Sequence, residues 1–482
     1  MQKDWGLLSK ALVRLPDDIV ERDPVLRIAK EFVGSAFLPG GAMNPAVQLA
    51  VDPRRIDLKS LPDPLVDLIL SQEMVAHRMR GDLDAVKVAR RLRQRLDRPD
   101  EQGRRPAHAA VPMHLLHVGI TEALAGDCRQ AIGDFSKGRM LPHPDGLPVI
   151  DWDLDLKRAL VSAAIGQHSE ADRVLAVAAA EEGPEVGEPF ATFIRGTVAA
   201  IRALLAVDRL DPDAPELVQE ALELNDGAEM WPFALLASTR WMTATGDLVG
   251  VLDAIDKAET LEQIPAASLA FEVATVARAK ALMLLGELAA AARVLDQVDE
   301  RPGGLFAIAV ARIRLTLLEE GPEPAIAAAR RLVVRRGVGP TARVEALLLE
   351  AWAQKALLGA VEPTRVAPLG PVIARKGLWR LLQLVPEHVV DDVPGLVGRA
   401  DFPRQLFLTE PSIGAGLSAV ELEVLEALAG PATLAEIAKS RFVSLNTVKT
   451  QVASIYRRLG VHGRRAAVSE AMRRGLIARP RG

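Results

Sequence analysis

Short polar and basic residues near the C-terminus recur at the spacing of one helix face. Within residues 445–459, apolar residues recur at intervals of three and four and predict one buried face of a helix. The opposite face carries Asn446, Lys449, Thr450, Ala453 and Arg457. Short side chains let a helix backbone approach the base edges of the major groove, and cations suit the phosphates beside it. The pattern therefore predicts a recognition helix for double-stranded DNA.

The residue types divide the expected contacts into base contacts and phosphate contacts. Lys449 can donate to guanine O6 or N7, and both Thr450 and Ala453 can contact a thymine methyl group. Asn446 can pair with adenine or bind a phosphate. We expect further phosphate contacts from hydroxyl groups and cations around the same helix: Thr433, Lys439, Ser444, Thr447, Arg457 and Arg458. The exposed amides at the two nearby helix starts add anion-binding groups.

Three further helices are predicted to hold the recognition helix. The first, at 419–428, follows Ser418, and Glu421 three positions on completes a capping-box pattern. A Gly–Pro pair ends this helix, and Thr433 caps the second one, at 434–440. Ser444 caps the recognition helix. The fourth helix, at 464–474, is amphipathic, so we expect it to close the core and to be a candidate dimer contact.

This four-helix pattern resembles the LuxR-type helix-turn-helix domain over residues 417–477. The matching residues are Leu417–Ser418, Glu421, Glu423–Val424–Leu425, Glu436–Ile437–Ala438, Val443–Ser444, Thr447–Val448–Lys449, Ile455, Leu459–Gly460–Val461, Arg464 and Ala467. Two positions depart from the family: Gln451 stands where His is usual, and Pro431–Ala432 where a Gly–Ser/Thr-like turn is usual. Neither departure removes a residue from the predicted groove-facing side. The resemblance implies a transcriptional regulator.

Charge is distributed unevenly along the 482 residues. Residues 414–482 hold 11 Lys and Arg against 5 Asp and Glu, whereas residues 1–413 hold 48 against 58. A small basic module joined to a large acidic one suggests that only the C-terminal part meets a polyanion. Aromatic residues make up 4% of the chain, and Ala and Leu are abundant, which favours helices over sheets.

Upstream of the basic module, glycine turns recur every 35–45 residues between helical stretches. These turns fall at Gly81, Gly126, Gly166, Gly246, Gly286, Gly321 and Gly359. One unit turns instead at residues 208–215. Glycine can take the left-handed conformation that ends a helix. Two helices per period predict an α-solenoid that resembles tetratricopeptide repeats (TPR), with an irregular all-α domain as the alternative.

The sequence thus predicts an all-α fold, in which a TPR-like α-solenoid is followed by a small four-helix LuxR-type helix-turn-helix domain. The predicted divisions are an N-terminal helical segment and loop at 1–63, the helical repeats at 64–385, a connecting segment and linker at 386–416, and the DNA-binding domain at 417–482.

The arrangement also resembles the large MalT-like regulators of the LuxR type, without their nucleotide-binding domain. The start of the chain is similar to the start of the repeat domain in those proteins. No GxxxxGK[ST] phosphate loop occurs, so ATP binding is not supported. Either the switch domain resides on another polypeptide, or the chain is a truncated or degenerate member. The resemblance implies that the solenoid groove holds a protein or small-molecule effector.

Residues with other chemistry do not form a recognised catalytic or metal pattern, and we expect no enzyme activity and no cofactor. His114 and His117 could share a helix face, but no further ligand stands at zinc-like spacing. Three aspartates at 151, 153 and 155 lack the rest of a calcium loop and are expected to lead into a helix. Cys128 is read as a plain thiol. Trp231 and Trp241 are candidates for a groove or for core packing.

The expected location and partners follow from these features. The start has no apolar segment of signal-peptide length, no stretch could span a membrane, and one cysteine fits a reducing compartment, so we expect a cytoplasmic protein. The expected partners are promoter DNA, a second copy of the chain on DNA, an effector and RNA polymerase, with no membrane. The alternative is a TPR-like interaction scaffold in which the helix-turn-helix only anchors or mediates assembly.

Overall fold

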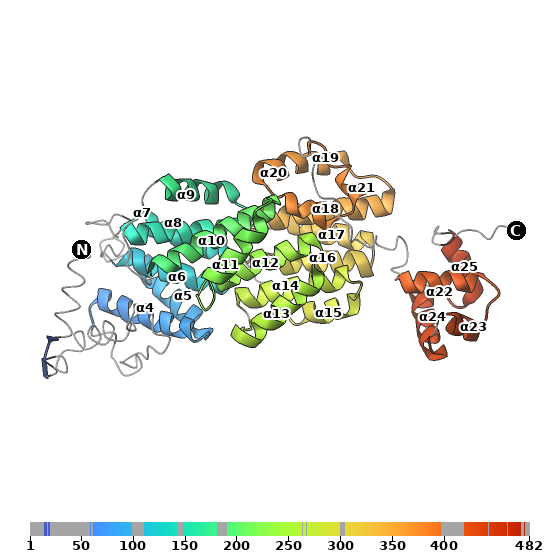
Figure 1. Cartoon of the computed structure of the whole chain (residues 1–482), viewed down its shortest axis with the longest axis horizontal. Coiled ribbons are helices and arrows are strands. Elements are labelled where there is room, and N and C mark those ends of the chain that lie inside the picture. The colour runs from blue at the N-terminus through green and yellow to red at the C-terminus, as the bar shows by residue number, and fades with distance from the viewer. Residues whose placement is uncertain are drawn as a thin grey trace. The chain divides into compact units, whose positions relative to one another are not determined.

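The fold is analysed in a computed structural model of the chain (Figure 1). The structure describes residues 14–16, 18–19, 58, 61–98, 110–141, 148–180, 190–262, 264–266, 268–298, 304–396, 419–441, 443–459, 461–473 and 477. The predicted segment at 1–63 therefore lies almost entirely outside the described residues. Every regular element in the described part is helical, which confirms the all-α fold. None of the described helices combines the length and apolar character needed to cross a membrane.

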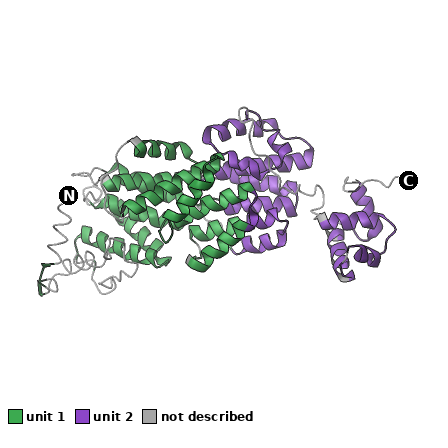
Figure 2. Ribbon diagram, in the orientation of Figure 1, with its two compact units in different colours: residues 1–245, 250–277, 298–306 green, residues 246–249, 278–297, 307–482 purple. Residues whose placement is uncertain are grey.

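The chain divides into two compact units, shown in green and purple in Figure 2. The first comprises residues 1–245, 250–277 and 298–306. Its helices, in chain order, are α4 (Asp63–Met79), α5 (Asp84–Asp97), α6 (Val111–Leu124), α7 (Cys128–Met140), α8 (Pro148–Ala164), α9 (His168–Ala180), α10 (Phe190–Arg209), α11 (Ala214–Leu224) and α12 (Trp231–Thr245). The next two helices, α13 (Leu248–Glu262) and α14 (Leu269–Leu284), contribute residues to both units.

Within the first unit the helices stack as successive hairpins. The first helices of the pairs form one row, in which α4 packs on α6, α6 on α8, α8 on α10 and α10 on α12. The second helices α5, α7, α9 and α11 each pack against the first helix of the following pair. No hairpin can cover its own apolar face alone, so the stacking supplies the core. This is the arrangement of an α-solenoid, as the repeated turns predict.

The turns between paired helices have the predicted positive φ, although ψ −175° places Gly321 outside the left-handed helical conformation. The seven predicted turn glycines all have positive φ: Gly81, Gly126, Gly166, Gly246, Gly286, Gly321 and Gly359. At Gly126 (φ 86°) the following amide, of Asp127, donates to the carbonyl of Glu122 at 2.8 Å and closes the helix end. The aberrant unit makes the same bond without glycine: Leu210 has φ 55°, and the next amide donates to Ala206 at 2.9 Å.

The second unit comprises residues 246–249, 278–297 and 307–482. Before the C-terminal module its helices are α15 (Leu288–Asp296), α16 (Ala307–Glu319), α17 (Pro322–Val334), α18 (Pro340–Leu358), α19 (Pro363–Val366), α20 (Leu369–Lys376), the 3-10 helix η3 (Trp379–Leu384) and α21 (Glu387–Val390). The long helix α18 packs with α16, α17 and each of the short elements that follow it. Its Trp352 is buried, and the guanidinium of Arg314 lies 5.8 Å from the ring centre.

Proline and glycine break the chain after α18 into short helices, yet these pack tightly. Leu381, Leu382 and Leu384 of η3 are buried, and the Leu384 carbonyl accepts a hydrogen bond from Nη1 of Arg314 at 2.7 Å. Val389 and Val393 are buried as well. The beginning of the stretch predicted to connect the domains, residues 386–396, is therefore part of this packed region.

Candidate nucleic-acid interface

Four helices form the C-terminal module: α22 (Ala419–Ala429), α23 (Leu434–Ser440), α24 (Leu445–Leu459) and α25 (Arg464–Arg473). Helix α24 packs against each of the other three, and α22 also packs against α25. The module has an apolar core of its own, made of Val424, Leu425, Leu428, Ile437, Ala438, Val448, Val452, Ile455, Leu459, Ala467, Ala471 and Ile477. This core fixes the position of α24 within the module.

The buried face of α24 is the one that the sequence predicts. Val448, Val452, Ile455 and Leu459 are all buried. With about 100° of rotation per residue, the five positions 446, 449, 450, 453 and 457 lie within one arc roughly opposite this buried face. Lys449 and Ala453, whose side chains are described, are both exposed. The helix is therefore exposed at both of the predicted positions whose side chains are described.

The other predicted contact residues differ in how much of them the structure describes. Lys439, at the end of α23, is exposed, as are Thr433, Ser444 and Thr447. Four positions lie on the backbone of α24 while their side chains fall outside the described part: Asn446, Thr450, Arg457 and Arg458. The role of each of the ten residues in binding stays a prediction.

Helix α23 begins at a capping box formed by Thr433 and Glu436. The T-x-x-E pattern of the sequence is the signal for such a cap. The amide of Glu436 donates to the Thr433 hydroxyl at 3.3 Å, and the amide of Thr433 donates to the Glu436 carboxylate at 2.7 Å. The Thr433 hydroxyl also lies 2.8 Å from this carboxylate. These bonds lower the pKa of Glu436, so it is ionised near neutral pH. Both donors of Thr433 are thus engaged, and a phosphate there would compete with Glu436.

The start of α24 keeps a donor for a phosphate. Ser444 Oγ accepts the amide of Thr447 at 3.0 Å, as expected for the cap of this helix. The hydroxyl oxygens of Ser444 and Thr447 lie 2.7 Å apart, so one of these hydroxyl groups donates to the other. Two hydroxyl groups carry two protons, and this bond uses one of them. Whichever residue donates, the second proton can still point to a phosphate oxygen.

Arg464 fastens α25 to the end of α22. Its Nε donates to the carbonyl of Leu428 at 2.8 Å, and its Nη2 donates to the carbonyl of Gly430 at 2.7 Å. The Leu428 carbonyl belongs to the last turn of α22, and the Gly430 carbonyl lies just after the helix, so neither has a partner within it. Arg464 is one of the family-matching positions, but its role across some 36 residues of sequence is visible only in the fold.

The turn between α23 and α24 is held from the first helix of the module. Arg441, just after α23, pairs with Glu423 of α22 at 2.7 Å. The amide of Val443 donates to the carbonyl of Ala438 at 3.1 Å, which shapes the turn. The two helices of the helix-turn-helix are thereby fixed relative to α22.

The other residues with possible chemistry lie in helices of the first unit and serve its packing. His114 is buried on α6, and burial, reinforced by Arg78, lowers the pKa of the neighbouring His117 to about 3. Cys128 is buried at the start of α7, and burial raises the pKa of its thiol. The aspartates at 151, 153 and 155 lie inside the first turns of α8, where they pair with Arg139, Lys157 and Arg158.

Known proteins resemble the chain in the C-terminal module. Residues 415–471 match the luxR family of bacterial regulatory proteins. Two relatives from Mycobacterium tuberculosis, strains CDC 1551 / Oshkosh and ATCC 25618 / H37Rv, are each named "Probable transcriptional regulatory protein NarL". Each is 48% identical over 61 residues, which is 13% of this chain and 28% of the relative. The chain therefore spans less than a third of the length of the curated relatives it matches.

The exposed face of α24, the capped starts of α23 and α24, and the shared core define a helix-turn-helix domain of the kind that binds DNA. This domain belongs to the luxR family of bacterial regulatory proteins. The family assignment predicted for residues 417–477 is thereby confirmed over residues 417–471.

Proposed function

We propose that the protein is a sequence-specific DNA-binding transcription regulator. The observation that carries the proposal is the exposed face of α24, opposite four buried residues, in a domain of a regulatory family. Lys449 and Ala453 would meet base edges together with Asn446 and Thr450. The relatives that share this domain are named as transcriptional regulatory proteins, which supports the same reading.

The phosphate contacts would come from both sides of the recognition helix. Lys439 lies at the end of α23, and Arg457 and Arg458 lie in the last turns of α24. The hydroxyl pair of Ser444 and Thr447 would serve the near end. One module covers only a short half-site, so a homodimer on DNA would supply the specificity of a promoter site.

We propose further that the helical region upstream controls this reader. The stacked hairpins offer surface for an effector or a protein partner, and the resemblance to MalT-like regulators supports such a role. Contact with RNA polymerase and a cytoplasmic location complete the proposal. The division of charge, with the basic residues concentrated after position 414, fits a reader that alone meets the polyanion.

Binding of Lys449→Ala to a selected duplex tests the role of α24. If Lys449 contacts a base, the substitution should weaken specific binding by roughly 1–3 kcal/mol and leave binding to random DNA less affected. Arg465→Ala is the matched control, since Arg465 is exposed on α25 and lies outside the proposed interface. Unchanged affinity of Lys449→Ala would remove this residue from the interface. If the wild-type protein showed no salt-sensitive binding to any duplex, the scaffold alternative would replace the regulator.

A further inference from the structure

A cavity of about 420 Å³ lies within the first unit, where turns from distant hairpins meet. The end of α4 and the α4–α5 turn form one wall, the end of α6 a second, and the α11–α12 turn with the α13–α14 loop the others. Gly81 of the first turn approaches Pro265 of the α13–α14 loop, so a Cβ atom at Gly81 would lie 3.4 Å from that ring. A cavity of this volume falls in the usual range for small-molecule sites.

A partly buried ion pair forms the polar side of the cavity. Nε and Nη2 of Arg78 donate to the two carboxylate oxygens of Glu229 at 2.8 and 3.3 Å. Nη1 donates to the carbonyl of His117 at 3.1 Å and to the hydroxyl of Thr121 at 3.0 Å, and Nη2 lies 3.4 Å from Nδ1 of His117. These five bonds use all five donors of the guanidinium. Arg78 is only 5% exposed and has no donor left for a ligand.

Carboxylate oxygens, by contrast, remain accessible on the cavity wall. The Glu229 side chain is 27% exposed and the Asp82 side chain 42% exposed. Each carboxylate has about four lone-pair sites, and Arg78 takes one on each oxygen of Glu229. Free acceptors therefore lie on the wall at Glu229 and Asp82, beside the exposed guanidinium of Arg80, which adds donors.

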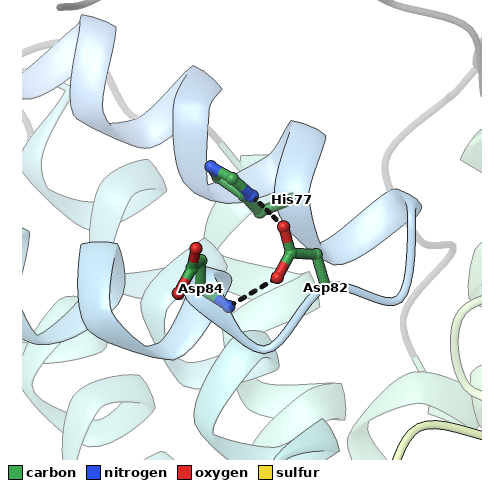
Figure 3. A group of neighbouring side chains, drawn as sticks. All are labelled: His77, Asp82 and Asp84. Atoms are coloured by element: carbon green, nitrogen blue, oxygen red, sulfur yellow. Dashed lines mark hydrogen bonds and ion pairs between the residues drawn. The ribbon is translucent and has the colours of Figure 1, made fainter.

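Asp82 is held in place by its own turn, as Figure 3 shows. Its Oδ2 lies 2.7 Å from Nδ1 of His77, and its Oδ1 accepts the amide of Asp84 at 2.9 Å. These bonds lower the pKa of Asp82, with the amide bond the larger cause, so the carboxylate is charged. Arg80 is the other cation on the wall, and its Nη2 lies 3.5 Å from the same His77 nitrogen.

The mouth of the cavity carries large apolar side chains that face water. Leu83 is 43% exposed and Leu261 is 65% exposed, although both line the cavity. The half-buried Trp231 lies on the wall beside Glu229. Apolar side chains around a cavity with a few convergent polar groups are typical of ligand sites.

We propose that this cavity binds a small organic cation, an amine on an apolar body. The apolar body would cover Leu83, Leu261 and Trp231, and the ammonium group would donate to the free lone pairs of Glu229 and Asp82. An aromatic face such as that of Trp231 also attracts cations. A bound amine would be the effector of the helical region, and only its effect on DNA binding rests on the proposed regulatory function. Binding of the amine to the cavity can be measured without DNA.

Three probes that share a phenyl ring on a short alkyl chain test the proposal by calorimetry on the full chain. They are 2-phenylethylamine, which is a cation, 2-phenylethanol, which is neutral, and 3-phenylpropanoate, which is an anion. A hydrogen bond to a charged group should make the amine at least about tenfold tighter than the alcohol. The anion should bind weakest, because the carboxylates repel it. Leu261→Ser should weaken binding of the amine several-fold, and Val177→Ser, at another exposed apolar position, on α9, should not.

Glu229→Gln should reduce the preference for the amine over the alcohol, because only the Asp82 carboxylate then remains. If that variant fails to fold because Arg78 loses its partner, the ranking of the three probes on the wild-type protein still decides. Stronger binding of the anion would assign the site to Arg80 and overturn the proposal, as would equal binding of all three probes or no saturable binding of the amine at millimolar concentrations. DNA affinity of residues 414–482 measured alone is independent of these outcomes, so failure here and failure of the regulator proposal are distinguishable.

Discussion

Arg464→Ala should loosen the DNA-reading module without touching its proposed DNA face. The arginine bonds two carbonyls at the end of α22, those of Leu428 and Gly430. Without it, α25 loses its polar link to α22, and both carbonyls depend on water. The adjacent Arg465 is exposed and forms no hydrogen bond to any residue within the described ranges, so Arg465→Ala removes the same charge and side chain without this link.

The size of the effect follows from the two bonds. A hydrogen bond that involves a charged group contributes about 1.5–3 kcal/mol where water is excluded. The bond to Leu428 is partly buried, whereas the bond to Gly430 is exposed and counts for less. We therefore expect Arg464→Ala to lower the free energy of unfolding by about 2 kcal/mol. In a domain of this size, that lowers Tm by roughly 8–16 °C.

Thermal and urea unfolding of residues 414–482, followed by circular dichroism, measure this difference. The module has its own core, so it is expected to unfold as one cooperative unit. Arg465→Ala should change the free energy of unfolding by no more than about 0.5 kcal/mol. Equal Tm values for the two variants would refute the role assigned to Arg464.

Two further predictions test local packing and pH dependence. Gly119→Ala should lower the free energy of unfolding by about 1–3 kcal/mol, because a Cβ atom would lie 2.4 Å from Cε1 of the buried Phe135. Gly133→Ala is the control, since its Cβ atom would lie 3.9 Å from the nearest neighbouring atom. Chemical denaturation of the full chain compares the two variants. Glu436 has a pKa below its usual 4.5, so its stabilising bonds to Thr433 are fully present above that value and are lost as the pH falls through the lower folded-state pKa. Glu436→Gln should therefore flatten the acid end of the stability profile of residues 414–482; identical urea midpoints for both proteins from about pH 7 to about pH 3 would argue against this.

Most helices and turns could be predicted from local sequence patterns. Glycine at a helix end constrains the backbone within a few residues, and the seven turn glycines have the expected positive φ. Glycine is not required at every turn, however, because Leu210 also has a positive φ where the chain turns between α10 and α11. The four-residue spacing of α24 likewise predicted its buried face, since every turn repeats the same geometry.

Contacts between distant parts of the chain could not be predicted in this way. The pair of Arg78 and Glu229 joins residues 151 positions apart, and nothing in either local sequence announces it. Arg464 resembles any other arginine of a basic helix until α25 meets the end of α22. In α22, the spacing of Leu422, Leu425 and Leu428 predicts one apolar face. Val424, outside that spacing, is also fully buried because α22 packs against both α24 and α25.

The salt dependence of DNA binding by residues 414–482 tests the central claim most directly. If Lys439, Arg457 and Arg458 each neutralise one phosphate, the logarithm of the association constant should fall with the logarithm of the salt concentration. The slope should be roughly −3 for each module bound. A duplex selected by the full-length protein should bind more tightly than random DNA of the same length at every salt concentration. Absence of binding, or an affinity that does not change with salt, would contradict the assignment of α24 and its neighbours as the DNA reader.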